Sequence, residues 1–141
     1  MPMKILLQSF LIVTVLFSAV LLSCSREKHV FLEEYLIKID SISMPDSVNL
    51  QSRFDVAFYG IIGSDGCSRF LRFEHKRIAN GYEVYVIGER KTGHALVCPE
   101  YLPVLNGEKL NLLADSLGHI QIKVINPGVA NHIIENIVVK Q

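Results

Sequence analysis

The side chains that could act as nucleophiles lie close together at the end of a glycine-containing stretch of this 141-residue chain. Ser64 or Cys67 could act as a nucleophile. His75 or His94 could accept its proton, and Asp65 could orient that histidine. The Gly-x-Ser-x-Gly turn that exposes a nucleophilic serine in many hydrolases is absent from the sequence. We therefore predict no catalytic residues.

The same stretch, Gly60-Ile61-Ile62-Gly63-Ser64-Asp65-Gly66, has a glycine at every third position. A phosphate-binding loop needs Gly-x-Gly-x-x-Gly, or Gly-x-x-x-x-Gly-Lys-Ser/Thr, followed by a helix. Neither pattern is met here, and a strand is expected to follow. We interpret the glycines as a conformational loop that places Cys67.

Five histidines could bind a metal ion: His29, His75, His94, His119 and His132. No two of them have the His-x-His or His-x-x-x-His spacing that puts two ligands on one strand or helix face. The sequence therefore predicts neither a metal site nor a bound cofactor.

The best candidates for a binding surface are three tyrosines, one arginine and one histidine around the charged segment that contains Asn80-Gly81. They are Tyr59, Tyr82, Tyr85, Arg72 and His94. Tyrosine and arginine are typical contact residues of interfaces. Ion pairs between neighbouring strands on a solvated face explain the charges equally well. Both interpretations stay open at this stage.

The first 23 residues have the parts of an export signal. A short segment with one positive charge, Lys4, precedes residues 5–22, which carry no charge. About 18 apolar residues are near the minimum for a transmembrane helix. The run ends in Leu21-Leu22-Ser23-Cys24, which resembles the lipobox of bacterial lipoproteins. That resemblance favours a cleaved lipoprotein signal over a membrane-spanning anchor.

The resemblance implies that Cys24 receives a diacylglyceryl group and that the chain is cut before it. The expected organisation is a signal peptide at 1–23, a lipidated tether at 24–29 and one β domain at 30–141, with no transmembrane helix in the mature chain. In such lipoproteins an Asp directly after the lipidated Cys favours the inner membrane. Ser25 stands there in this chain, so we expect an extracytoplasmic protein in the outer rather than the inner membrane.

With Cys24 assigned to lipid attachment, Cys67 and Cys98 remain as an even pair. In an oxidising compartment such a pair is expected to form a disulfide. A reactive or metal-binding pair would need a Cys-x-x-Cys motif or nearby Cys and His ligands, which the sequence lacks. We predict a structural disulfide between Cys67 and Cys98.

Charge and size limit the classes of function. The 14 Lys and Arg balance the 14 Asp and Glu, and Lys4 lies in the signal, so the mature chain has a net charge of about −1. A basic stripe for nucleic acid is missing, and we predict no nucleic-acid partner. The mature length suits one domain with its own core.

The remaining sequence predicts short strands separated by turns. Residues 30–39 fit a strand or a helix, with the strand favoured by their aromatic and Ile content. Further strands are expected at 53–59, 68–76, 82–89, 109–113, 119–125 and 133–140. On the strand at 82–89, Tyr82, Val84 and Val86 share one face. Turns or irregular segments are expected at 41–47, Asn80-Gly81, 90–94, 95–104, Asn106-Gly107 and 126–128.

Seven to nine short strands at this spacing predict an all-β fold, a single antiparallel β-sandwich. The arrangement resembles an immunoglobulin-like sandwich in strand number and size, although it has no Trp and its cysteines are close in sequence. The segment Phe-x-Val-x-Phe-Tyr-Gly-x-x-Gly-x-x-Gly-Cys, followed by a strand, an Asn-Gly hairpin and a second Cys, resembles small envelope lipoproteins of the Bacteroidetes type.

These observations lead to three hypotheses on function. The first is a membrane-anchored, non-catalytic interaction or accessory module of a bacterial envelope complex, with the bilayer as partner through Cys24. The second is a module that binds glycan or a small ligand, in which exposed tyrosines stack on sugar rings. The third is an enzyme or an enzyme inhibitor.

Overall fold

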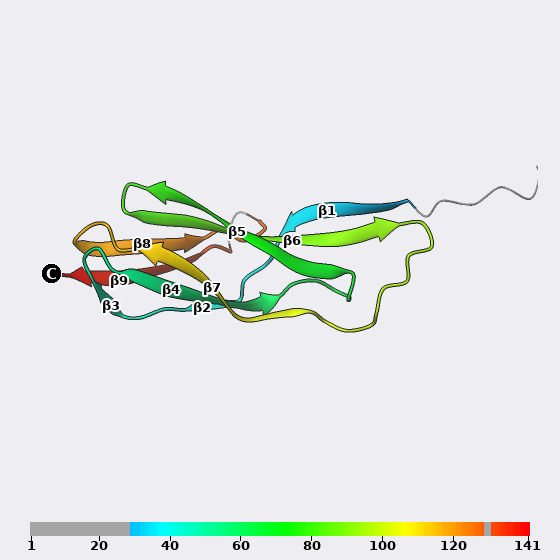
Figure 1. Ribbon diagram of the computed structural model, residues 1–141, viewed down its shortest axis with the longest axis horizontal. Coiled ribbons are helices and arrows are strands. Elements are labelled where there is room, and N and C mark those ends of the chain that lie inside the picture. Colours follow the sequence, from blue (N-terminus) through cyan, green and yellow to red (C-terminus); the bar gives the residue numbers. More distant parts are fainter. Residues whose placement is uncertain (1–28, 129–130) are drawn as a thin grey trace, which may run out of the picture.

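The computed structural model describes residues 29–128 and 131–141, which form strands and loops (Figure 1). Its nine strands are β1 (Val30–Leu36), β2 (Ser41–Ser43), β3 (Ser47–Asn49), β4 (Arg53–Ile61), β5 (Ser68–Ile78), β6 (Gly81–Gly93), β7 (Val104–Leu113), β8 (Gly118–Val124) and β9 (Ile133–Lys140). The predicted all-β class is confirmed for these residues. None of them belongs to a helix long and apolar enough to cross a membrane. The predicted signal peptide, Cys24 and all of the tether except His29 lie outside the described residues.

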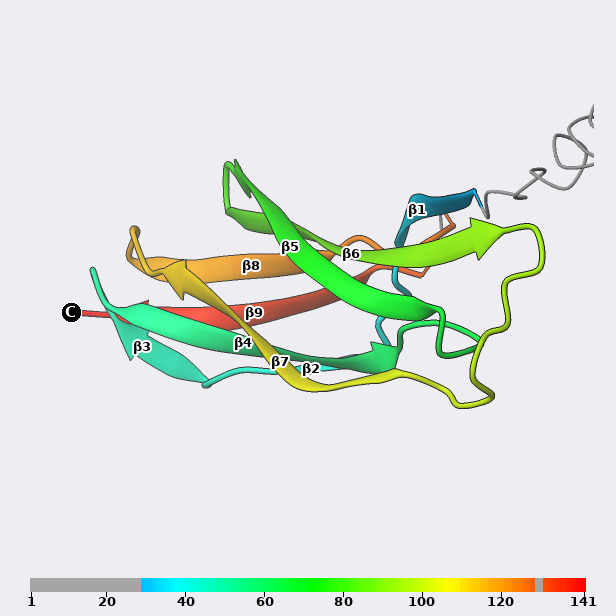
Figure 2. The same ribbon diagram turned by 45° about the vertical axis from the view of Figure 1, so that its right-hand side comes forward.

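The strands form two sheets (Figure 2). The six-stranded sheet has the order β1-β6-β8-β9-β3, and β5 also pairs with β6. The three-stranded sheet has the order β2-β4-β7. The long β6 is the centre of the larger sheet, because β5 follows one of its edges while β8 and β1 share the other.

One hydrophobic core lies between the sheets. The predicted alternation holds on β4, where Phe54, Val56 and Phe58 are buried. It also holds on β8, where Ile120 and Ile122 are fully buried. The other buried apolar residues of this core are Ile37, Ile39, Ile62, Tyr82, Val84, Val86, Leu105, Leu112, Ala114, Val124, Ile137 and Val139. Residues two apart face the same side of a strand, so both sheets turn their apolar faces inward.

The prediction of a purely antiparallel arrangement is wrong at two pairings. β6 and β8 pair in parallel, with Tyr82 opposite Ile122. β3 and β9 also pair in parallel, with Val48 opposite Val139. The first pairing is parallel because β7, which belongs to the other sheet, connects β6 to β8 and runs back along the molecule between them. β8 therefore starts at the same end of the molecule as β6.

Asn106-Gly107 is not a turn between strands. It lies inside β7, opposite Phe58 and Tyr59, where the register shifts by one residue. Gly107 has φ +90° and is the extra residue of a β-bulge. Asn106-Gly107 correctly indicated a residue with positive φ, but Gly107 adopts that conformation in a bulge and not in a turn.

The predicted hairpin between β5 and β6 is confirmed, but its turn lies one residue earlier than expected. Ile78 pairs with Gly81, so Ala79 and Asn80 form the turn. Gly81, at φ +157°, begins β6 beside β8. A Cβ atom at Gly81 would lie 1.8 Å from the backbone oxygen of Gln121, so only glycine fits this close approach.

The boundaries of three expected elements also differ. β6 continues through 90–93, which were expected to be a loop, because these residues pair with β1 and Val30 lies opposite Gly93. The expected turn at 41–47 contains β2 and the start of β3, each only 3 residues long. Within residues 30–39 the favoured strand is confirmed as β1, but it ends at Leu36.

Candidate functional site

A disulfide joins two loops at one end of the molecule, and it confirms the predicted pair. Cys67 ends the loop after β4, and Cys98 lies in the segment that connects β6 to β7. Their Cα atoms are 5.2 Å apart across a sequence separation of 31. Closing a loop of that length stabilises a fold by about 3–4 kcal/mol. We call residues 30–32, 61–67 and 94–104 the disulfide end.

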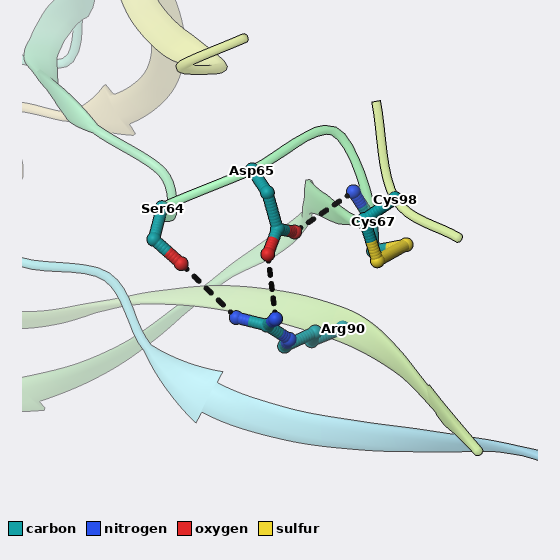
Figure 3. Close-up of a disulfide and its surroundings, with 5 residues drawn as sticks. All are labelled: Ser64, Asp65, Cys67, Arg90 and Cys98. Carbon is teal, nitrogen blue, oxygen red and sulfur yellow. Dashed lines mark hydrogen bonds and ion pairs between the residues drawn. A yellow bond between two sulfur atoms is a disulfide. The ribbon is translucent and has the colours of Figure 1, made fainter. Parts of the chain in front are cut away.

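Polar side chains hold the first of these loops against β6 (Figure 3). Asp65 accepts a hydrogen bond of 3.1 Å from the backbone N–H of Cys67. Its other carboxylate oxygen lies 2.6 Å from a guanidinium nitrogen of Arg90. Arg90 also donates to the hydroxyl oxygen of Ser64 at 3.1 Å. One arginine on β6 therefore fixes two residues of the loop that ends at Cys67.

Backbone hydrogen bonds join the second loop to the first. The carbonyl oxygen of Pro99 accepts from Gly66 at 2.9 Å and from Tyr101 at 3.1 Å. The carbonyl oxygen of Pro103 accepts from Ile62 at 2.8 Å. Proline has no N–H to donate, which keeps residues 95–103 out of a sheet while its carbonyl groups remain acceptors. The expectation of an irregular segment here is confirmed.

This fixed second loop carries apolar side chains on its outer surface. Val97 is 88% exposed, Leu102 58% and Tyr101 57%. Ile61 and Val104, at the adjoining strand ends, are also about half exposed. Because the disulfide and the backbone hydrogen bonds hold the loop, these side chains cannot turn inward without breaking that network.

The beginning of β1 adds further apolar side chains to the same end. Val30, Phe31 and Leu32 are exposed, and Val30 pairs with Gly93 directly before the second loop. Figures 1 and 2 both show the start of β1 and the β6–β7 connection at one end, with the C-terminus at the other. Other large exposed apolar residues among the described ones are Leu117 and Ile134, which lie elsewhere.

The residues considered for nucleophilic chemistry serve the loop structure instead. The Cys67 sulfur is bonded to Cys98, so it cannot attack a substrate or bind a metal as a thiolate. Asp65, Cys67 and Cys98 place ligand atoms within 4.8 Å of one another, but both sulfurs are oxidised and Asp65 is paired with Arg90. His75 lies on β5 opposite Val84, away from this loop.

The structure does not bring the three predicted tyrosines together. Tyr82 is buried, and its hydroxyl donates to the carbonyl oxygen of Leu113 at 2.9 Å. Its proposed role as an exposed stacking platform is therefore wrong, because it faces the core with Val84 and Val86. Tyr59 is half-buried on β4 in the smaller sheet, whereas Tyr85 lies on the outward face of β6 in the larger one.

Arg72 belongs to a charged outer face of the larger sheet. Its guanidinium donates to both carboxylate oxygens of Glu34 on β1, at 2.9 and 2.8 Å. It also donates to Glu74 on its own strand at 2.8 Å. The hydrogen bond from Arg72 holds the pKa of Glu34 below its ordinary value of 4.5. Cross-strand ion pairing thus accounts for this arginine, while His94 is exposed directly after β6.

The opposite end of the molecule is closed by polar side chains. We call the β5–β6 turn together with residues 115–117 the hairpin end. Arg77 donates to the two carboxylate oxygens of Asp115 at 2.9 and 2.7 Å, and to the carbonyl oxygen of Gly81 at 2.6 Å. Its guanidinium carbon lies 4.9 Å from the centre of the Tyr82 ring.

A shallow surface hollow of about 290 Å³ lies beside the β2–β3 connection. Met44, Pro45 and Asp46 line one side, and Glu135 and Asn136 on β9 line another. The hollow is open and mostly polar. Its carboxylates have no histidine, cysteine or basic partner among the lining residues, so it supports no particular chemistry.

Sequence reasoning missed the apolar side chains of the disulfide end. The available signal was an apolar run, 95–104, interrupted by Pro99 and Pro103. Such a run cannot alternate inward and outward as a paired strand does, so its apolar side chains have no assured place in the core. No protein-family model, no curated protein and no solved structure matches this chain.

Proposed function

We propose that the protein is an exported bacterial lipoprotein, held in the membrane through lipid on Cys24. Its β domain is a non-catalytic interaction or accessory module of an envelope complex. The observation that carries this proposal is Leu21-Leu22-Ser23-Cys24 at the end of a charge-free run. Two acyl chains or more on one cysteine make membrane attachment effectively permanent.

The disulfide supports an extracytoplasmic location. Disulfides persist in oxidising compartments and are rare where thiols are kept reduced. Of the three cysteines, the two outside the lipobox are joined to each other, which leaves Cys24 for lipid. Ser25 in place of Asp favours the outer membrane over the inner membrane.

An interaction role is favoured over catalysis by how the candidate reactive groups are used. Cys67 is bonded, Asp65 is paired with Arg90, and Ser64 accepts from the same arginine. A surface with several exposed apolar side chains, in contrast, is typical of a contact site.

An immunoglobulin-like sandwich is our proposal for the finer class of the fold. Two sheets around one core and a chain of this size support it. The parallel β6–β8 and β3–β9 pairings count against a strict immunoglobulin topology, whose sheets are antiparallel.

Metabolic labelling tests the lipid anchor. The full chain, tagged at its C-terminus, is expressed in a bacterium fed an alkyne fatty acid, beside a Cys24→Ser variant. We expect label on the wild type only, and a mature mass that starts at an acylated Cys24. A Ser25→Asp variant should still be labelled but should move to the inner-membrane fraction. An unlabelled wild type that retains residues 1–23 would refute the proposal.

Cross-linking in living cells tests the interaction role. The C-terminus lies far from the start of β1, so a tag there leaves the anchored end free (Figure 1). We expect one specific envelope protein to co-purify with the wild type and to be lost with Cys24→Ser. Recovery of the same protein with the wild type and with Cys24→Ser would mean that the interaction does not require the lipid anchor. Recovery of none would contradict the accessory-module role.

A further inference from the structure

The disulfide end combines three properties that no other part of the described chain shares. Its apolar side chains are exposed, its backbone is fixed by a covalent bond, and it contains the start of β1. We propose that this end is a second membrane contact, in which Val97, Tyr101 and Leu102 insert into the headgroup layer of the bilayer that holds Cys24. The inference rests on the proposed lipid anchor.

The length of the tether places this end near the lipid. An extended chain spans at most about 3.3–3.6 Å per residue, so residues 24–29 keep Val30 within roughly 20 Å of the lipidated cysteine. Val30 pairs with Gly93, and the exposed loop starts at the next residue. The apolar loop is therefore held close to the membrane surface, whereas the hairpin end is at the far end of the molecule (Figure 2).

The side chains match the interface of a bilayer better than its centre. Tyrosine is enriched at the level of the headgroups, where its ring is in lipid and its hydroxyl in water. Tyr101 and Leu102 project from the loop beside Glu100, which is also exposed. A carboxylate next to these side chains limits their depth to the headgroup region, because a charge is costly in the hydrocarbon.

The rigidity of the loop favours insertion. A flexible loop would lose conformational entropy on ordering at the surface. Here the disulfide, the Asp65–Arg90 pair and the Pro99 carbonyl already fix the loop. The exposed side chains are therefore presented without a further ordering step, and one contact would also set the orientation of the domain.

The absence of tryptophan from the sequence gives a direct test. Leu102→Trp places the sole indole of the protein at the disulfide end. Leu117→Trp places it at the hairpin end, at a residue of similar exposure, 52% against 58%. Each full-length lipidated variant is reconstituted into vesicles of phosphatidylethanolamine and phosphatidylglycerol that contain brominated phosphatidylcholine. Flotation and the mass of the mature N-terminus are measured on the same samples.

We expect brominated lipid to quench the L102W emission roughly twofold and to leave L117W emission nearly unchanged. Lipidated, floating protein with neither indole quenched would overturn the second contact and leave the anchor intact. Equal quenching of both would also overturn it, because the domain would then lie flat. A blue-shifted but unquenched L102W indole would assign the surface to a protein partner or a second copy. Protein without lipid that does not float would refute the anchor and the contact together.

Discussion

The two ends of this sandwich are closed in different ways. At the hairpin end, Arg77 binds Asp115 and the carbonyl oxygen of Gly81, and polar side chains cover the turn. At the disulfide end, a covalent bond is added to the Asp65–Arg90 pair in closing the loops, and apolar side chains remain outside. The comparison teaches that where a covalent bond helps to hold the loops, the exposed side chains there are not needed for stability. They are then available to contact another molecule.

Of the changes that distinguish the two ends, loss of the disulfide should lower the stability of the protein most. We expect Cys67→Ser combined with Cys98→Ser to lower the free energy of unfolding by about 3–4 kcal/mol, because the unfolded chain gains the freedom of an open loop. Urea denaturation with and without reductant measures the change. The wild type should approach the variant in reductant, and the variant should not respond. A wild type that is insensitive to reductant would contradict this account.

Two glycines, one at each end, should differ in their tolerance of a methyl group. At Gly81 a Cβ atom would meet the backbone of Gln121, so Gly81→Ala should force β6 and β8 apart and cost about 2–3 kcal/mol. At Gly66 the nearest atoms are in the exposed ring of Tyr101, which can rotate away, and the Cβ atom of Pro99 lies 3.0 Å off, so Gly66→Ala should cost only about 1 kcal/mol. Thermal unfolding of the two variants measures both losses of stability, and equal losses would refute the predicted difference between the two glycines.

Acid should act on ion pairs toward both ends. Hydrogen bonds from Arg72 and Lys123 lower the pKa of Glu34 and of Glu83 in the folded state. The unfolded chain then binds more protons, so the stabilisation is present above the ordinary value of 4.5 and is lost as pH falls below it. Glu34→Gln and Glu83→Gln should each flatten the fall in stability below that pH. Unfolding measured between neutral pH and pH 3 tests this, and an unchanged acid dependence would be inconsistent with either pair.

The smallest effect should come from the exposed apolar side chains themselves. Leu102→Gln at the disulfide end and Leu117→Gln at the hairpin end should each change the free energy of unfolding by less than about 0.5 kcal/mol, because more than half of each residue is already exposed to water. Urea midpoints of the two variants are the measurement. A large loss for Leu102→Gln alone would mean that this residue holds the loop together and is not available for contact.

The sequence predicted most strands because alternation of apolar residues is a local signal. Ile120 and Ile122 on β8 and Phe54 and Val56 on β4 could be assigned inward from their spacing alone. The same rule placed Tyr82 with Val84 and Val86, so its burial was already implied when it was proposed as a binding residue. The disulfide followed from the number of cysteines and their expected compartment.

Strand partners and surface roles could not be predicted in this way. The parallel partner of β6 depends on which sheet receives β7, a choice made by packing between distant residues. An Asn-Gly pair signals positive φ, and Gly107 shows that a bulge can satisfy the signal as well as a turn. The apolar loop was missed because residues 95–104 have no strand period that would assign each side chain to a face.

The pairing of β3 with β9 restricts when this protein can fold. Val48 of β3 pairs with Val139 of β9, so β3 cannot join the larger sheet before β9 has been synthesised. β8 depends on the same strand, since every residue from Gly118 to Val124 pairs with β9. A chain made from its N-terminus therefore cannot complete the larger sheet until residues 133–140 are available. Completion of the larger sheet is therefore a late event, because its pairings join residues that are far apart in the sequence.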